Sequence, residues 1–310
     1  MRHDISLKQS AIERITATAG VFFLFCSLAI PLLVAQDGSD APFSASLEKW
    51  KAHGMYGITE EQRRVERDGE DQAVTDHVLN VPELDMEFVW IEEINAWVGR
   101  YEVTNAQYRR YLPDHESDTS RLEKDFNTDD RPVISVCYDL SDTLARVGRV
   151  RHFIDWLNER EREAGRLPEG WSFDLPTGDE WTNFARCGDG RAFPWGEGWP
   201  PAYGNYADET AQKHLSEHLA AFIKGYDDGH AHTAPVQESG RNDLGLFGVG
   251  GNVAEMTLER DDTGRIGVRG GSWGHSSPGT LTVDYRMWLE DRRHRSGHNL
   301  VGFRLVLAPR

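Results

Sequence analysis

Three histidines and one serine near the carboxyl end of the chain are the first candidates for chemistry. His275, His294 and His298 lie within the last forty residues, and Ser272 precedes the first of them. Imidazole binds zinc, copper and iron. The basic run at 292–295 would repel a cation, however. The residue types therefore favour surface polar histidines over a metal site.

Cysteine chemistry is limited, because the chain has only Cys26, Cys137 and Cys187. Copper(I) requires soft ligands, which thiolates supply, and none of the three lies in the tail. Cys137 is in an apolar, strand-like run, and Cys187 is at the end of an expected helix. The two could form a disulfide in an oxidising compartment, or they could remain buried free thiols. Both alternatives are compatible with the sequence.

Short motifs rich in glycine and aromatic residues follow one another in a fixed order along the second half of the chain. They are LPTGDEW (175–181), FPWG (193–196), GNYAD (204–208), TAPV (233–236), GNVAE (251–255), RGGSW (269–273) and GFRLV (302–306). This ordered set, over residues 84–310, resembles the formylglycine-generating enzyme (sulfatase-modifying factor) family. The resemblance implies an α+β fold, a loop-rich variant of the C-type lectin fold with short strands and a few helices.

The resemblance also implies a chemistry that the chain lacks the residues to perform. The family's oxidase binds copper through two cysteines just after the Gly-Gly-Ser turn and oxidises a substrate cysteine. Here those two positions are His275 and Thr280. Ser272 matches the family's active-site serine, although a serine in such a turn often bonds nearby backbone. We therefore expect no copper site and no formylglycine-generating activity, with Ser272 and His275 as the remaining catalytic candidates.

A calcium site is the second implication of the resemblance. Calcium takes six to eight oxygen ligands from carboxylates, amides and backbone carbonyls. The matching side chains are Asn205 and Asp228, with the carbonyls of Tyr206 and His230, and Asp208 and Asp227 are acidic alternatives nearby. Asn and Asp are also common turn residues, which is the alternative interpretation.

A second, weaker calcium site would use Glu255 with the carbonyls of Gly251 and Val253. Its first ligand position, usually Asn or Asp in the family, is Gly248 here, and the usual aromatic beside the glutamate is replaced by Ala254. A missing oxygen ligand lowers calcium affinity. Glu255 could instead bond backbone or pair with an arginine.

The elements that must position these residues begin near residue 84. Two strands are expected, at 87–91 and 96–103, followed by a short helix at 105–112 that Thr104 caps. Apolar residues at three- and four-residue spacing predict a longer helix over 141–164. Thr177 and Glu180 form a capping box for a third helix, which runs through Ala185.

The first 82 residues have a different character. Residues 1–35 carry basic residues before an apolar stretch, which is typical of a secretory signal peptide or an N-terminal membrane anchor. We therefore expect an exported protein, which is secreted, periplasmic or tethered to a membrane. Residues 36–82 are polar and charged and predict a linker, with a short helix possible around 47–51. The sulfatase-modifying-factor-like domain would then span residues 83–310.

Composition excludes one class of partner. The net charge of −17 disfavours nucleic acid, because affinity for phosphate backbones depends on Lys and Arg. A cationic and aromatic set stands out against this acidic background in the tail, and it comprises Tyr285, Arg286, Trp288, Arg292, Arg293, His294 and Arg295. Arg and aromatic side chains are common interface anchors. We expect a protein partner or an anionic ligand there, unless the aromatics are core and the arginines pair with the chain's own carboxylates.

Three hypotheses follow from these observations. The first is an exported binding or scaffold module that is catalytically silent. The second is an oxidative tailoring enzyme of the same family with altered metal chemistry, which would use Ser272 or His275. The third is a true formylglycine-generating oxidase, which the residues at 275 and 280 disfavour.

Overall fold

The computed structural model describes residues 40–57, 78–117, 124–139, 148–215, 219, 221–289 and 299–310. The predicted signal or anchor and Cys26 lie outside these residues. Within the described ranges, no helix is both long and apolar enough to cross a bilayer. The chain divides into two units, residues 1–39 and Asp40–Arg310, and the second contains all of the described structure.

Short elements separated by long loops make up this second unit. The helices are α1 (Asp40–Ala52), α3 (Asn105–Arg109), α4 (Val150–Glu163), α5 (Gly178–Arg186) and α6 (Glu209–Leu215), with 3-10 turns η1 (Glu92–Ile94), η2 (Lys124–Asn127), η3 (Val236–Glu238) and η4 (Pro278–Thr280). The strands are β1 (Val78–Val81), β2 (Met86–Ile91), β3 (Ala96–Gly99), β4 (Val136–Cys137), β5 (Gly148–Arg149), β6 (Trp171–Asp174), β7 (Ala254–Arg260), β8 (Ile266–Arg269), β9 (Arg286–Leu289), β10 (Val301–Gly302) and β11 (Val306–Pro309).

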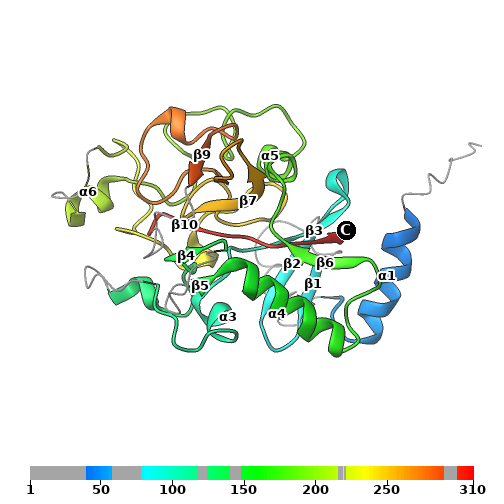
Figure 1. The fold of residues 1–310 in the computed structure, drawn as a ribbon. Coiled ribbons are helices and arrows are strands. Elements are labelled where there is room, and N and C mark those ends of the chain that lie inside the picture. The colour runs from blue at the N-terminus through cyan, green and yellow to red at the C-terminus, as the bar shows by residue number, and fades with distance from the viewer. Residues whose placement is uncertain are drawn as a thin grey trace, which may run out of the picture. The chain divides into compact units, whose positions relative to one another are not determined.

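The strands form two main sheets that the end of the chain connects. A five-stranded antiparallel sheet has the order β1-β2-β3-β11-β6, and a four-stranded sheet has the order β10-β7-β8-β9. β10 pairs with β7 in parallel, and only three residues separate β10 from β11. The last segment of the chain therefore leaves one sheet and enters the middle of the other (Figure 1).

The principal core lies between α4 and the sheets. Val150, Phe153 and Leu157 of α4 are fully buried and belong to one apolar cluster with strand residues such as Phe88 and Phe173. Figure 1 shows α4 running alongside the five-stranded sheet. The amphipathic face that the sequence predicted for this helix is therefore the face that packs.

Part of the predicted linker is folded. α1 places Trp50 in the core, where its ring meets Trp97 at 5.8 Å and Trp171 at 4.9 Å between centroids, both edge to face. Met55 is also buried, and β1 adds an edge strand to the sheet. Local composition at 36–82 is polar, but two large apolar side chains are enough to anchor the segment.

Other elements differ from the predictions mainly at their ends. The strand predicted at 96–103 stops at Gly99, and the helix predicted at 105–112 ends at Arg109. The helix predicted over 141–164 begins only at Val150, because residues 148–149 form β5; residues 141–147 lie outside the described structure. The capping boxes at Thr104 and at Thr177 are both present.

Candidate functional site

The Gly-Gly-Ser-Trp turn lies against the loop at 250–252 through backbone hydrogen bonds. The N–H of Gly271 donates to the carbonyl of Gly250 at 3.1 Å, and the N–H of Trp273 donates to the carbonyl of Asn252 at 2.8 Å. A Cβ at Gly271 would come within 2.2 Å of the buried Leu281 side chain, so a larger residue there would displace that side chain. The turn is therefore held rigidly in the domain.

Ser272 and His275 form a hydrogen-bonded pair within this turn. Ser272 Oγ lies 2.8 Å from Nδ1 of His275, and the serine is fully buried. Burial lowers the pKa of His275 below its usual value, so the ring is neutral near pH 7. Thr280, at the other position that matches a family cysteine, donates its hydroxyl to the carbonyl of Ser277 at 2.9 Å. A serine in such a turn often bonds nearby backbone, whereas the partner of the Ser272 hydroxyl here is the His275 side chain.

Asn205 and Asp228 are brought together by the loops that follow FPWG. Oδ2 of Asp228 accepts the N–H of Tyr206 at 2.9 Å, and its Oδ1 accepts the N–H of His230 at the same distance. Asn205 is fully buried, and its Nδ2 donates to the carbonyl of His232 at 2.8 Å. The predicted ligands therefore lie on two adjoining loops.

The buried amide oxygen of Asn205 is the strongest sign of an ion. Within the described part of the chain, its Oδ1 has no hydrogen-bond partner. A buried polar atom without a partner costs roughly 1–3 kcal/mol. Amide and carboxylate oxygens are ligands that calcium accepts. The side chains at this position therefore fit a calcium ion.

Acidic residues around this position do not form a conventional metal cluster. The described residues contain no group of three or more His, Cys, Asp or Glu side chains arranged to hold a metal. Burial and the neighbouring carboxylate of Asp208 raise the pKa of Asp228. Asp208 itself accepts the N–H groups of Ala211 and Asp228, and Asp227 accepts the Thr210 hydroxyl. An ion here would depend on Asp228, an amide and backbone carbonyls.

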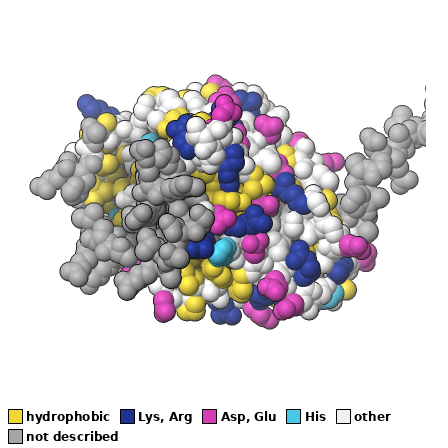
Figure 2. Space-filling view, viewed as in Figure 1, with side chains coloured by type: hydrophobic (Ala, Val, Ile, Leu, Met, Phe, Trp, Pro, Cys, Tyr) yellow, Lys and Arg dark blue, Asp and Glu magenta, His cyan; other side chains and the backbone are white. Residues whose placement is uncertain are grey.

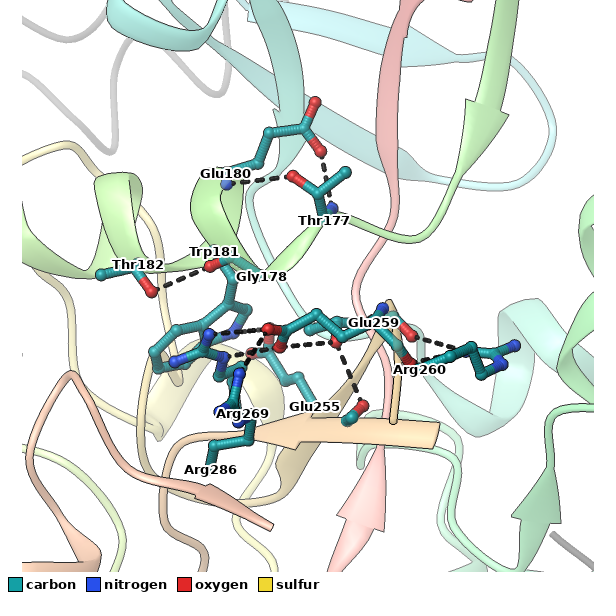
Figure 3. Close-up of polar contacts among 12 residues, drawn as sticks. Thr177, Gly178, Glu180, Trp181, Thr182, Glu255, Glu259, Arg260, Arg269 and Arg286 are labelled. Carbon is teal, nitrogen blue, oxygen red and sulfur yellow. Dashed lines mark hydrogen bonds and ion pairs between the residues drawn. The ribbon is translucent and has the colours of Figure 1, made fainter. Parts of the chain in front are cut away.

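Glu255 pairs with Arg304, one of the alternatives that the sequence left open. Its Oε1 lies 2.8 Å from Nη2 of Arg304, and neither side chain is exposed. Its Oε2 accepts the indole N–H of Trp181 at 2.9 Å (Figure 3). Glu255 therefore already has a counter-charge and two hydrogen-bond donors within the protein.

The second predicted calcium site would take its first ligand from position 248. The carboxylate of Glu102 occupies the space that a side chain at this position would need. A Cβ at Gly248, whose φ is +71°, would lie 2.6 Å from Oε2 of Glu102. Glu102 is buried and accepts bonds from Asn252 Nδ2 and the N–H of Val253. Burial raises the pKa of Glu102 to about 8, against the opposing charge of Arg304. The carbonyls of Gly251 and Val253 therefore lie beside an internal polar network.

The cysteines are free, which is the second of the two predicted alternatives. Cys137 is buried in β4, and Cys187 is half-buried at the end of α5. Neither belongs to the segment that contains Ser272 and His275. Burial also raises the pKa of the Cys187 thiol.

The cationic and aromatic segment is described only in part. Residues 290–298 lie outside the described structure, and they include Arg292, Arg293, His294, Arg295 and His298. The Arg286 guanidinium lies over the Trp288 ring at 4.6 Å and bonds Glu259 at 2.9 Å. Figure 3 shows that Arg269 and Arg286 both bond the Glu259 carboxylate. Arg286 is thus paired with the chain's own acid. Figure 2 shows acidic and basic side chains interspersed over one face.

Three residues of this region were missed as site residues, namely Glu102, Asn252 and Arg304. Each lies inside a motif that the sequence displays, respectively EVTN, GNVAE and GFRLV. The available signal was a charged or amide residue flanked by apolar and glycine residues, which is the setting of a buried polar group. Nothing in the spacing shows which of them meet.

A model of the sulfatase-modifying factor enzyme 1-like domain matches residues 85–309. No curated protein sequence matches the chain. The structure of PvdO from Pseudomonas aeruginosa is similar, with 16% identity and a TM-score of 0.51 over 74% of this chain and 97% of that one. Treponema denticola variable protein 1 shares 17% identity, with a TM-score of 0.46, over 77% of this chain and 90% of its own. CarF shares 19%, with a TM-score of 0.45, over 69% and 86%.

Proposed function

We propose that this chain, which belongs to the family of sulfatase-modifying factor enzyme 1-like domains, is an exported binding or scaffold module without formylglycine-generating activity. Its fold is the formylglycine-generating-enzyme variant of the C-type lectin fold, as the motifs predicted. The likeness to PvdO, at 16% identity, concerns the fold alone. The function must therefore be argued from the side chains.

The observation that carries the proposal is the bond between Ser272 and His275. A copper(I) site of the family's type needs two thiolates, and position 275 holds an imidazole whose Nδ1 is already bonded to Ser272 at 2.8 Å. The hydroxyl of Thr280 bonds the backbone of its own turn. At both positions the side chain is hydrogen-bonded within its own turn. This supports the proposal that the chain does not perform the family's copper chemistry.

A tailoring enzyme with altered metal chemistry is the second candidate, and the same pair favours it. A hydroxyl hydrogen-bonded to an imidazole is the arrangement in which a base activates a nucleophile. Ser272 is fully buried, however, so its oxygen is not accessible to a substrate in this conformation. The binding module is the better-supported of the two.

Calcium is the ion that we propose for this module, held by the side chains of Asn205 and Asp228 with the carbonyls of Tyr206 and His230. The unpartnered Asn205 Oδ1 and the half-buried Asp228 carboxylate support it. When bound, the ion would cross-link the two loops and stabilise the folded state by mass action. We also propose that a protein or anionic ligand binds at Trp288, Arg292, Arg293 and Arg295. Residues 1–35 would serve as the export signal or as a membrane tether.

Copper(I) affinity tests the loss of copper chemistry. We expect the purified chain to take no copper(I) from a strong competing chelator beyond what a variant with Cys137→Ser and Cys187→Ser takes. The variant with His275→Cys and Thr280→Cys supplies the missing thiolates and serves as the matched comparison. Stoichiometric copper(I) binding by the wild-type chain that His275→Ala removes would contradict the proposal.

A further inference from the structure

A chain of buried side-chain hydrogen bonds joins Glu102 to Asn205 through Asn252. Glu102 Oε2 accepts from Asn252 Nδ2 at 3.0 Å, and Asn252 Oδ1 accepts from Asn205 Nδ2 at 2.9 Å. All three residues are buried. The backbone N–H of Asn252 also donates to the carbonyl of Asn205 at 2.9 Å, so the two segments are joined twice.

The amide of Asn252 has only one satisfactory orientation. Its Oδ1 faces the backbone N–H of Ala234 at 2.8 Å, a group that can only donate, and its Nδ2 faces an oxygen of Glu102 at 3.0 Å. Turning the amide over would place its N–H₂ against the N–H of Ala234. A buried mismatch of that kind is costly. The N–H of Ala234 therefore fixes which end of Asn252 faces Asn205.

That orientation fixes the amide of Asn205 in turn. The two protons of its Nδ2 are donated to Asn252 Oδ1 and to the carbonyl of His232, which are both acceptors. Reversing the amide would bring three oxygens together. Asn205 Oδ1 must therefore point to the opposite side, where the described residues give it no donor.

We propose that Asn252 is a positioning residue for a calcium ion at Asn205 and Asp228, and that Glu102 holds Asn252 in place. This inference rests on the calcium site of the proposed function. Asn252 is not itself a ligand, because its Oδ1 already accepts two hydrogen bonds. Its backbone has φ of +57°, a left-handed conformation that Asn adopts more readily than most residues.

Calcium titration of the purified whole chain, followed by calorimetry, tests the inference. Asn252→Gly suits the backbone conformation and removes the acceptor that orients Asn205, so the calcium Kd should rise about 10- to 100-fold, as for other groups that orient metal ligands. Asn252→Asp keeps an acceptor oxygen toward Asn205, and the Glu102 carboxyl, whose pKa burial raises to about 8, can donate its proton to the other Asp oxygen. Its Kd should stay within about threefold of the wild type, since the oxygen does the positioning.

Asn158→Ala is the matched control. Asn158 is another buried asparagine, whose amide bonds Ile154 and Phe173 in α4 and β6. Its loss should lower the melting temperature while leaving the calcium Kd unchanged. A role for Asn252 in stability alone would give the same pattern, with a lower melting temperature and an unaltered Kd.

The outcomes separate the inference from the calcium site on which it rests. Calcium binding that Asn205→Ala abolishes but Asn252→Gly leaves within about twofold would overturn the positioning role alone. Equal losses of affinity in Asn252→Gly and Asn252→Asp would overturn it as well, and this comparison remains decisive if the glycine variant must be studied at lower temperature. A wild-type chain that binds no calcium would overturn the site and the inference together.

Discussion

Arg304 and Glu255 form an ion pair in which the Nη2–Oε1 distance is 2.8 Å and neither side chain is exposed. The remaining guanidinium N–H groups reach the carbonyls of Gly99, Arg100 and Phe247. Arg304 lies between β10 and β11, and Glu255 lies on β7. The pair therefore connects β7 of the four-stranded sheet to the segment that links the two sheets, between β10 and β11.

Arg304→Met should strongly destabilise the fold. It leaves the buried Glu255 carboxylate with no counter-charge beside it and removes one donor from each of three carbonyls, so the free energy of unfolding should fall by about 3–5 kcal/mol. Urea unfolding measures this directly. Arg151→Met is the control, because Arg151 pairs with Asp155 at the surface, where such a change costs less than about 1 kcal/mol. Similar losses in the two variants would contradict the structural role of Arg304.

Gly248→Asn should fail to create the second calcium site. The new Cβ would meet the Glu102 carboxylate and the backbone would be forced to keep a positive φ, so the variant should lose about 2 kcal/mol or more of stability. Thermal unfolding with calcium and with chelator checks both expectations. Gly190→Asn is the control, since a Cβ there meets nothing within 4 Å. A variant that is as stable as wild type and gains a calcium-dependent stabilisation would refute this reading.

His115 should make stability depend on acidity. Burial lowers its pKa from 6.5 to about 4, and this outweighs the hydrogen bond between its Nε2 and the carbonyl of Ile134, which favours the charged ring. Its buried Nδ1 has no partner among the described residues. The unfolded chain therefore binds a proton at higher pH than the folded chain. The contribution of His115 to the free energy of unfolding is fully present above pH 6.5. It falls by up to about 3 kcal/mol as the pH drops through 4.

The variant His115→Phe keeps a ring against Tyr108 and removes the titration. Its free energy of unfolding should therefore fall less than that of wild type between pH 7 and pH 4, in urea titrations at each pH. Equal slopes for the two proteins would show that other groups, such as His275 and His230, whose pKa values burial also lowers, account for the acid sensitivity.

Trp50→Ala should show that the folded domain begins before residue 83. The ring is fully buried against Trp97 and Trp171, and its loss should cost about 3–5 kcal/mol. A chain that begins at residue 83 would lose α1 and β1 as well, and should unfold at a lower temperature than one that begins at residue 40. Equal melting temperatures for the two chains would restore the linker interpretation for this range.

Local signals in the sequence were sufficient for several elements. The capping boxes at Thr104 and Thr177 are each formed within four residues, and the apolar spacing of α4 depends on its own turns. The tertiary anchors could not be predicted in this way. Trp50 lies in a polar stretch, and its aromatic partners 47 and 121 residues away show that the segment folds.

The candidate site was predictable in composition but not in arrangement. The motifs marked Asn205, Asp228, Ser272 and His275, and the structure shows how their neighbours engage them. Glu255 was marked as a calcium ligand, with an arginine as one alternative partner. The choice of Arg304 depends on β10 pairing with β7, which brings together residues 49 apart. Sheet pairing over such a distance leaves no trace in local spacing.

The most direct test of the central claim is mass spectrometry of a peptide that carries a sulfatase-type cysteine. The purified chain would be incubated with this peptide, copper(I) and oxygen, beside a copper-only control and an oxidase that retains both cysteines. With His275 bonded to Ser272 and threonine at 280, we expect no formylglycine above the copper-only control. Formylglycine produced over multiple turnovers by this chain would contradict the account.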